Sequence, residues 1–185
     1  MRRRGLRITG GSVRGRILTM IASNAGRSTS SLLREAMFAS LATVEGLTVL
    51  DLCAGTGVLA VEALSRGAIE ATCVERSSQN VRVIHRNVAI AGFGDRTTVL
   101  CRRAEDFLRS PTGTYNLIFA DPPYRDEILI DSIVEMVSAS LAGGARFVLE
   151  HSSRGTLPMA PQCLVHDRTR SHGDSAFTIY KRVDT

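Results

Sequence analysis

The sequence predicts an α/β protein with a Rossmann-like, doubly wound and mostly parallel sheet. Two observations carry this prediction. Short apolar or β-branched runs alternate with segments of helical periodicity between residues 48 and 149. The first of these units joins a strand to a helix through a turn in which Gly55 and Gly57 flank Thr56. Because such sheets bind ligands at the carboxyl ends of their strands, we expect the residues that follow the strands to share one rim.

The individual elements follow from periodicity and from capping residues. The predicted strands of the sheet lie at 48–50, 71–75, 97–101, 115–120 and 145–149. Predicted helices span 31–41, capped by Ser31, and 58–66, 77–91, 105–108 and 128–141, the last ended by Gly143-Gly144. Two short strands at 7–11 and 14–18 predict an N-terminal basic β-hairpin, and 163–169 and 176–181 predict an antiparallel C-terminal strand pair.

The composition suits a single globular core. Of the 185 residues, 44% are hydrophobic and 22% charged, and no apolar run approaches the roughly 20 residues that span a bilayer. The four histidines have no metal-ligand spacing with one another or with the cysteines. We therefore expect a cytoplasmic, monomeric protein without a membrane or metal partner.

The net charge of +5 is concentrated at the N-terminus. Residues 1–34 contain eight arginines and no acid, whereas the remainder carries 15 basic and 18 acidic residues. Arginine binds phosphate through bidentate contacts, so this segment is expected to contact a polyanion. A transit peptide would share this composition, but the glycines of the segment disfavour an amphipathic helix. We predict a basic arm that contacts such a polyanion at 1–30 and a larger α/β domain at 31–185.

The glycine turn and two acids form a candidate site. The turn lacks the third glycine of the dinucleotide fingerprint, so it favours a nucleoside-like ligand over a diphosphate cofactor, and an ordinary strand-to-helix turn remains the alternative. Glu75 ends the next strand, where an acid can accept the hydroxyls of a ribose. Asp121-Pro122-Pro123-Tyr124 follows a buried strand. Here the sequence resembles the S-adenosylmethionine-dependent N-methyltransferases, with their Asp-x-x-x-Gly-x-Gly loop and Asp/Asn-Pro-Pro-Tyr/Phe motif.

That motif suits methylation of a base amine. The lone pair of an exocyclic amine is delocalised into the ring, and hydrogen bonds to the Asp121 carboxylate and the Pro122 carbonyl would direct it at the methyl donor. Pro122 and Pro123 restrict the backbone so that this carbonyl faces the pocket, and Tyr124 would stack on the base. The alternative is a loop turn with a capping Asp and a packed Tyr.

A set of motifs spread over residues 7–181 is similar to the bacterial RsmD family. They are Arg7-Ile8-Thr9-Gly10-Gly11, Arg14-Gly15-Arg16, Arg27-x-Thr29, Arg34-Glu35-x-x-Phe38, Asp51-Leu52-x-Ala54-Gly55-Thr56-Gly57, Glu62-Ala63-Leu64-Ser65-Arg66-Gly67-Ala68, Glu75, Asn87, Asp121-Pro122-Pro123-Tyr124, Gly173-Asp174 and Ile179-Tyr180. The resemblance implies a class I methyltransferase that uses S-adenosylmethionine to methylate the N2 of one guanine in 16S ribosomal RNA, free or within the small subunit.

The resemblance also implies roles for individual residues. Those expected to bind the cofactor are Asp51, Ala54, Gly55, Thr56, Gly57, Glu75, Arg76 and Ala104. Those expected to act on the guanine are Asp121, Pro122, Pro123 and Tyr124. Those expected to bind RNA phosphates are Arg7, Arg14, Arg16, Arg27 and Arg34. For Arg34 the alternative is a solvated helical ion pair with Glu35.

The chain departs from the family pattern at Arg103, where an Asp or Asn that contacts adenine is expected. Arginine offers only donors, so it cannot accept a bond from the adenine amine, and Glu105 or Asp106 would have to replace that contact. Two other functions stay open. One is methylation of another amine, such as adenine N6 in DNA or a protein glutamine, and the other is a non-catalytic RNA-binding role in assembly.

Overall fold

The computed structural model describes residues 6–21 and 30–184. Its strands are β1 (Leu6–Arg7), β2 (Ile17–Leu18), β3 (Thr48–Leu52), β4 (Glu70–Glu75), β5 (Thr97–Cys101), β6 (Tyr115–Ala120), β7 (Leu141–Ser152), β8 (Leu164–His172) and β9 (Ser175–Arg182). Its α-helices are α1 (Ser31–Ala39), α2 (Val58–Ser65), α3 (Ser78–Ala91), α4 (Ala104–Arg109) and α5 (Glu127–Met136), with 3-10 turns η2 (Gly94–Arg96) and η3 (Val137–Ser140).

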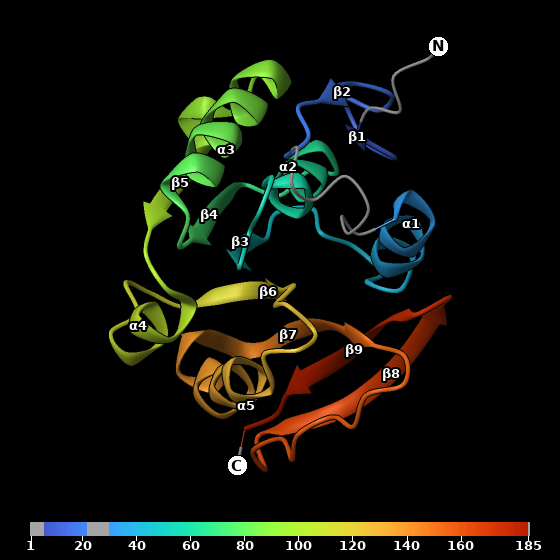
Figure 1. Ribbon diagram of the computed structural model, residues 1–185, viewed down its shortest axis with the longest axis vertical. Helices are drawn as coiled ribbons and strands as arrows, with labels where there is room; N and C mark the ends of the chain where they lie inside the picture. The colour runs from blue at the N-terminus through green and yellow to red at the C-terminus, as the bar shows by residue number, and fades with distance from the viewer. Residues whose placement is uncertain (1–5, 22–29, 185) are drawn as a thin grey trace.

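Seven strands form one sheet in the order β5-β4-β3-β6-β7-β9-β8, and Figure 1 labels each of them, from teal β3 to red β9. The first five strands in this order are parallel to one another, and β9 runs antiparallel between β7 and β8. The predicted fold class, including the antiparallel C-terminal pair, is therefore confirmed. Strand order reverses between β3 and β6, and a crevice for a ligand forms at the carboxyl ends of strands where such a reversal occurs.

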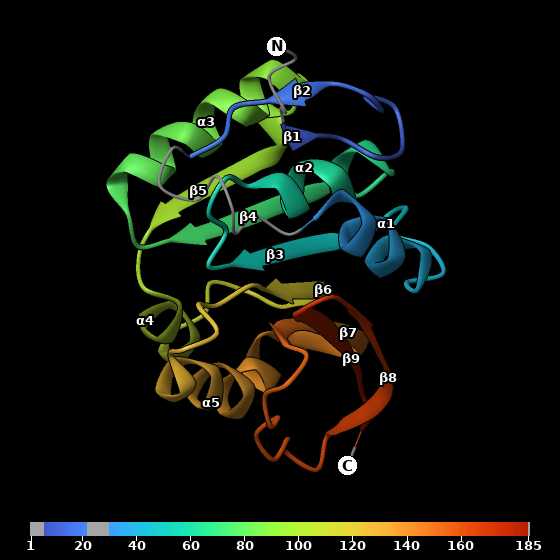
Figure 2. The ribbon, with the colours of Figure 1, turned by 45° about the vertical axis from the view of Figure 1, so that its right-hand side comes forward.

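Two hydrophobic clusters cover the two faces of the sheet. Residues of α1, α2 and α3 form one cluster, and residues of α4 and α5 form the other. The hairpin belongs to the first cluster through Leu6, Ile8 and Leu18. Figure 2 shows β1 and β2 beside α2 and α3, on the side away from α4 and α5. Burying these three side chains makes the hairpin part of the core that supports the sheet.

Several predicted boundaries were wrong. The two strands of the hairpin are Leu6–Arg7 and Ile17–Leu18, shorter than the predicted 7–11 and 14–18. Helix α1 is capped by Ser30, whose side chain accepts a hydrogen bond from the Leu33 N–H, and not by Ser31.

The helix predicted to reach residue 141 ends at Met136, and Gly143-Gly144 lie inside β7. Pairing with β6 explains this difference, because Leu141 already lies opposite Tyr115 in the sheet. In the parts of the chain that the structure describes, no helix is long and apolar enough to cross a membrane.

Candidate active site and the hairpin that packs beside it

Three parallel strands carry the predicted acids to one rim of the sheet. Leu52 of β3 pairs with Val74 of β4 and with Ala120 of β6. Asp51, Glu75 and Asp121 each lie within one residue of these paired positions. Three segments that are far apart in the sequence therefore meet at the crevice, as the predicted shared rim requires.

The glycine turn is tightly constrained. Gly55 and Gly57 have φ angles of +54° and +72°, and Gly57 caps the N-terminus of α2. A Cβ at Gly57 would lie 3.0 Å from Ile84 Cγ2 of α3, so both the backbone angle and the packing favour glycine there. Cys53 is a non-glycine residue with positive φ, +59°, in the same turn.

Asp51 is a buried carboxyl with one unused acceptor. Asp51 is 1% exposed, and its Oδ2 accepts a hydrogen bond from the Ala60 N–H at 3.2 Å. Oδ1 has no hydrogen-bond partner among the residues of the described segments. Burial raises the pKa of Asp51 to about 7. Burying a carboxylate oxygen without a hydrogen bond costs free energy unless a ligand donates to it. A cationic group of a ligand would be such a donor.

Glu75 holds the glycine turn in place. Its Oε2 accepts the Gly55 N–H at 2.9 Å and its Oε1 accepts the Ser77 N–H at 2.8 Å. Each oxygen of an ionised carboxylate retains further lone-pair capacity. Glu75 can therefore brace the turn and still accept ribose hydroxyls, and the bracing was not foreseen from the sequence.

Two cavities lie along this rim. The smaller, about 300 Å³, is lined by Glu75, Arg76, Ala104 and Glu105 among others. The larger, about 900 Å³, contains most of the other predicted site residues. These are Asp51, Ala54, Gly55, Thr56, Asp121, Pro122, Pro123 and Tyr124. Four residues, Cys53, Gly55, Asp121 and Pro123, line both. Gly57 lines neither.

Tyr124 has partners that the sequence did not reveal. Its hydroxyl lies 2.8 Å from Glu150 Oε1 and 2.9 Å from Ser175 Oγ. Burial, followed by the charge of Glu150, raises the pKa of Tyr124 above its ordinary value. Glu150 and Ser175 come from β7 and β9 and also line the larger cavity. The antiparallel end of the sheet thus contributes to this site.

Arg34 was predicted to bind RNA phosphates, and the structure contradicts this. Arg34 is 0% exposed, its Nε lies 3.3 Å from Glu62 Oε2, and its Nη2 donates to the Arg7 carbonyl oxygen at 2.5 Å. The alternative of a solvated pair with Glu35 is also wrong, because the described partner is buried Glu62. A guanidinium enclosed in this way supports the fold and cannot reach RNA.

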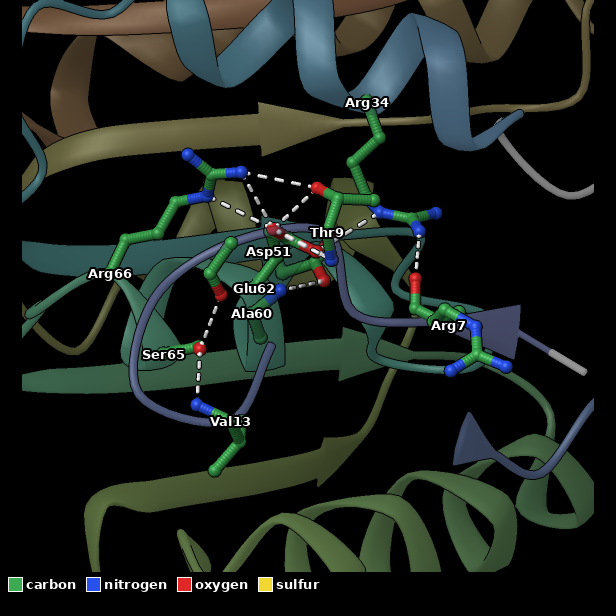
Figure 3. Close-up of polar contacts among 10 residues, drawn as sticks. Arg7, Thr9, Val13, Arg34, Asp51, Ala60, Glu62, Ser65 and Arg66 are labelled. Atoms are coloured by element: carbon green, nitrogen blue, oxygen red, sulfur yellow. Dashed lines mark hydrogen bonds and ion pairs between the residues drawn. The ribbon is translucent and has the colours of Figure 1, made fainter. Parts of the chain in front are cut away.

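Glu62 of α2 is the centre of a clamp on the hairpin (Figure 3). Its Oε1 accepts from Thr9 Oγ1 at 2.7 Å and from Arg66 Nε at 3.0 Å. Its Oε2 accepts from the Thr9 N–H at 2.9 Å and from Arg34 Nε at 3.3 Å. Glu62 is 0% exposed. Two arginines and the hairpin backbone thus offset the cost of removing its carboxylate from water.

A second set of contacts fixes the turn of the hairpin to the end of α2. Ser65 Oγ donates to the Gly10 carbonyl at 2.6 Å and accepts the Val13 N–H at 3.1 Å (Figure 3). The Ser65 carbonyl accepts the Ser12 N–H at 2.7 Å, and a Cβ at Gly11 would lie 1.9 Å from that carbonyl oxygen. The Glu-Ala-Leu-Ser-Arg block of α2 is therefore the docking surface for the hairpin.

Three of the other arginines predicted to bind RNA lie on the hairpin surface. Arg7, Arg14 and Arg16 are exposed. Arg7 Nη1 donates to the Gly15 carbonyl at 2.7 Å, and Arg16 Nη1 donates to the Ile90 carbonyl at the end of α3 at 2.8 Å. Arg27 lies outside the described residues. The clamp therefore presents these arginines on a supported surface.

Arg103, at the unusual position, does not line either cavity. Its side chain is exposed, and its Nη2 lies 2.7 Å from Glu105 Oε1. Glu105 lines the smaller cavity beside Ala104, whereas Asp106 pairs with Arg109 at 2.7 Å. Of the two acids considered as replacements for the missing Asp or Asn, Glu105 is the one at the cavity.

The fold and this site define a class I methyltransferase, the class whose methyl donor is S-adenosylmethionine. The model of the family described as Conserved hypothetical protein 95 matches residues 6–181, and the chain belongs to that family, the RsmD family. The Escherichia coli (strain K12) Ribosomal RNA small subunit methyltransferase D is 33% identical over 96% of this chain and 90% of the relative. The Bacillus subtilis protein YlbH is 29% identical over 96% of this chain and 99% of its own.

A solved structure has the same arrangement. That of the Escherichia coli protein yhhF superposes with a TM-score of 0.87 at 30% sequence identity, covering 97% of this chain and 99% of that one. The similarity therefore extends over almost the whole chain.

Proposed function

We propose that the protein transfers a methyl group from S-adenosylmethionine to the exocyclic N2 of a guanine in 16S ribosomal RNA. The observation that carries the proposal is the larger cavity, in which Asp51 and the glycine turn share one space with the Asp121–Tyr124 segment. A donor held by the first group would thus face an acceptor held by the second. This substrate would place the protein with the ribosomes of the cytoplasm, where we expect it to act as a monomer.

The residues present fit the proposed cofactor. The unpartnered Oδ1 of Asp51 suits the ammonium of the methionine end, and the Glu75 carboxylate suits the ribose hydroxyls. Arg76, Ala104 and Glu105 would enclose the adenine in the smaller cavity. When bound, the sulfonium supplies an activated methyl carbon, so positioning of the amine is the main task left to the protein.

The Asp121–Tyr124 segment would hold the guanine. The Asp121 carboxylate and the Pro122 carbonyl would accept the two hydrogens of the amine, which leaves the nitrogen lone pair directed at the methyl carbon. The amine can release its extra proton after transfer, so no strong side-chain base is needed. Tyr124 would stack on the base, which must leave its own stack to enter the cavity.

The hairpin would bind the RNA around that base. Arg7, Arg14 and Arg16 are exposed on a hairpin that the Glu62 clamp holds in place, and Arg27 follows in the same basic segment. Phosphate contacts of this type make binding weaken as salt rises, with a slope of about −0.7 per contact for single strands.

The affinity for S-adenosylmethionine should depend on pH through Asp51. Its pKa of about 7 means that the carboxyl gains a proton as pH falls below 7, and the neutral form attracts the ammonium less. An α-amino group, with a pKa of about 8, stays protonated throughout that range. We therefore expect Kd to rise by up to about tenfold per pH unit below 7, measured by isothermal titration calorimetry. Asp51→Asn should bind S-adenosylmethionine weakly, with a Kd that hardly depends on pH. The control variant Asp131→Asn should behave as the unmodified protein. If Kd did not depend on pH in the unmodified protein and in Asp131→Asn, the assignment of Asp51 would be refuted.

Methyl transfer itself tests the proposal. The protein is mixed with labelled S-adenosylmethionine and small ribosomal subunits that lack guanine-N2 methylation, with naked 16S rRNA, duplex DNA and ribosomal proteins in parallel, and the modified residues are identified after digestion. We expect label only in N2-methylguanosine. Label in N6-methyladenine or methylglutamine would replace the proposed substrate, and RNA binding without label would support the non-catalytic alternative.

A further inference from the structure

The hydroxyl of Tyr124 is held at the junction of three separate segments. Tyr124 follows β6, Glu150 lies near the end of β7 and Ser175 begins β9. Ser152 pairs with Ser175 across the β7-β9 ladder, and Glu150 pairs with Phe177. The register of this antiparallel ladder therefore sets where the two partners of the hydroxyl lie.

The two bonds have complementary directions. A phenol has one proton, and the stronger acceptor is the Glu150 carboxylate, at 2.8 Å. Tyr124 therefore donates to Glu150, and Ser175 donates its own hydroxyl proton to the phenol oxygen across 2.9 Å. Glu150 is only 2% exposed, so its hydrogen bonds are formed with little competition from water.

These bonds act on a ring that lines the cavity. Tyr124, Glu150, Ser175 and Asp121 all line the larger cavity. The backbone of the segment is also closed by a turn, in which the Asp126 N–H donates to the Pro123 carbonyl at 2.9 Å. With the backbone held at one end and the hydroxyl at the other, the ring cannot swing to another χ1 rotamer without breaking both hydrogen bonds.

We propose that Glu150 and Ser175 are positioning residues that fix the ring of Tyr124 as the stacking platform for the target base. This inference rests on the proposed function and adds a role for the antiparallel end of the sheet. Stacking needs the ring to lie beside the base, and a ring that is free to change its χ1 rotamer spends only part of its time at that position. A preorganised platform lowers the ordering cost when the RNA binds.

Steady-state kinetics with the RNA substrate test the role. Glu150→Ala and Tyr124→Phe should each raise KM for RNA by about tenfold, with less change in kcat and an unchanged Kd for S-adenosylmethionine. Glu150→Gln keeps an acceptor oxygen and should restore KM to within about threefold of the unmodified protein. Ser175→Ala should have a smaller effect in the same direction, and Ser171→Ala, at an exposed position of β8, should have none.

The double variant separates positioning from general support of the fold. If Glu150 acts through the Tyr124 hydroxyl, Glu150→Ala should add almost nothing in a Tyr124→Phe background. Additive effects of the two substitutions, or a Glu150→Gln variant as impaired as Glu150→Ala, would overturn the proposal. If Glu150→Ala fails to fold, the comparison of Tyr124→Phe, Glu150→Gln and Ser175→Ala still decides it.

Ionisation of tyrosine gives a test that needs no RNA. The protein has three tyrosines and no tryptophan, so tyrosinate absorbance is readily followed. At a pH near the ordinary tyrosine pKa of about 10, Tyr124→Phe should leave the signal unchanged, because Tyr124 stays protonated. Removing the Glu150 charge in Glu150→Gln should shift the alkaline titration of Tyr124 to lower pH, and adding Tyr124→Phe should remove the shifted component. An unshifted titration would refute the contact itself, whereas the expected shift without RNA methylation would refute only the proposed function.

Discussion

Replacing Asp121 by alanine should lower kcat for methyl transfer by about 10²–10³-fold while leaving the Kd for S-adenosylmethionine within about twofold. Asp121 lines both cavities, and its carboxylate is the acceptor proposed to orient the amine. Without it, the lone pair of the amine remains delocalised into the base and is not directed at the methyl carbon. Single-turnover rates at saturating RNA and cofactor measure this loss apart from binding.

Two further variants serve as a conservative substitution and as a control. Asp121→Asn keeps an acceptor oxygen and should retain more activity than Asp121→Ala. Asp131→Ala removes an exposed carboxylate from α5 and should match the unmodified protein. If Asp121→Ala lost cofactor binding and activity together, Asp121 would belong to the cofactor site and its assigned role would be wrong.

Replacing Glu62 by alanine should destabilise the protein by about 3–5 kcal/mol. Glu62 and Arg34 are both 0% exposed, so removing the carboxylate removes a buried negative charge that faces the Arg34 guanidinium in the core. The backbone N–H and hydroxyl of Thr9 also lose their acceptors. Urea denaturation followed by circular dichroism measures the free energy of unfolding directly.

The control for this experiment is Glu135→Ala, which removes an exposed glutamate from α5 and should change stability by less than about 0.5 kcal/mol. Glu62→Gln keeps the shape and one acceptor oxygen but not the charge, so it should fall between the two. A loss of less than about 1 kcal/mol in Glu62→Ala would show that the hairpin does not depend on this carboxylate.

The fold class and the acids of the rim could be predicted from local patterns in the amino-acid sequence. Strand and helix periods are local properties, and parallel strands always bring their carboxyl ends to one edge. Asp51, Glu75 and Asp121 could therefore be placed together from three separate segments. The glycine turn was predictable for the same reason, since positive φ at Gly55 and Gly57 is a local demand of the backbone.

Which polar residues are buried and support the fold, and which face solvent, could be seen only in the tertiary structure. Arg34 and Arg16 look alike in the sequence, yet one is enclosed beside Glu62 and the other is exposed. The partners of Tyr124 were equally hidden, because Glu150 and Ser175 are 26 and 51 residues away along the chain. Burial and long-range hydrogen bonds depend on how elements pack against one another, and no local pattern records that packing.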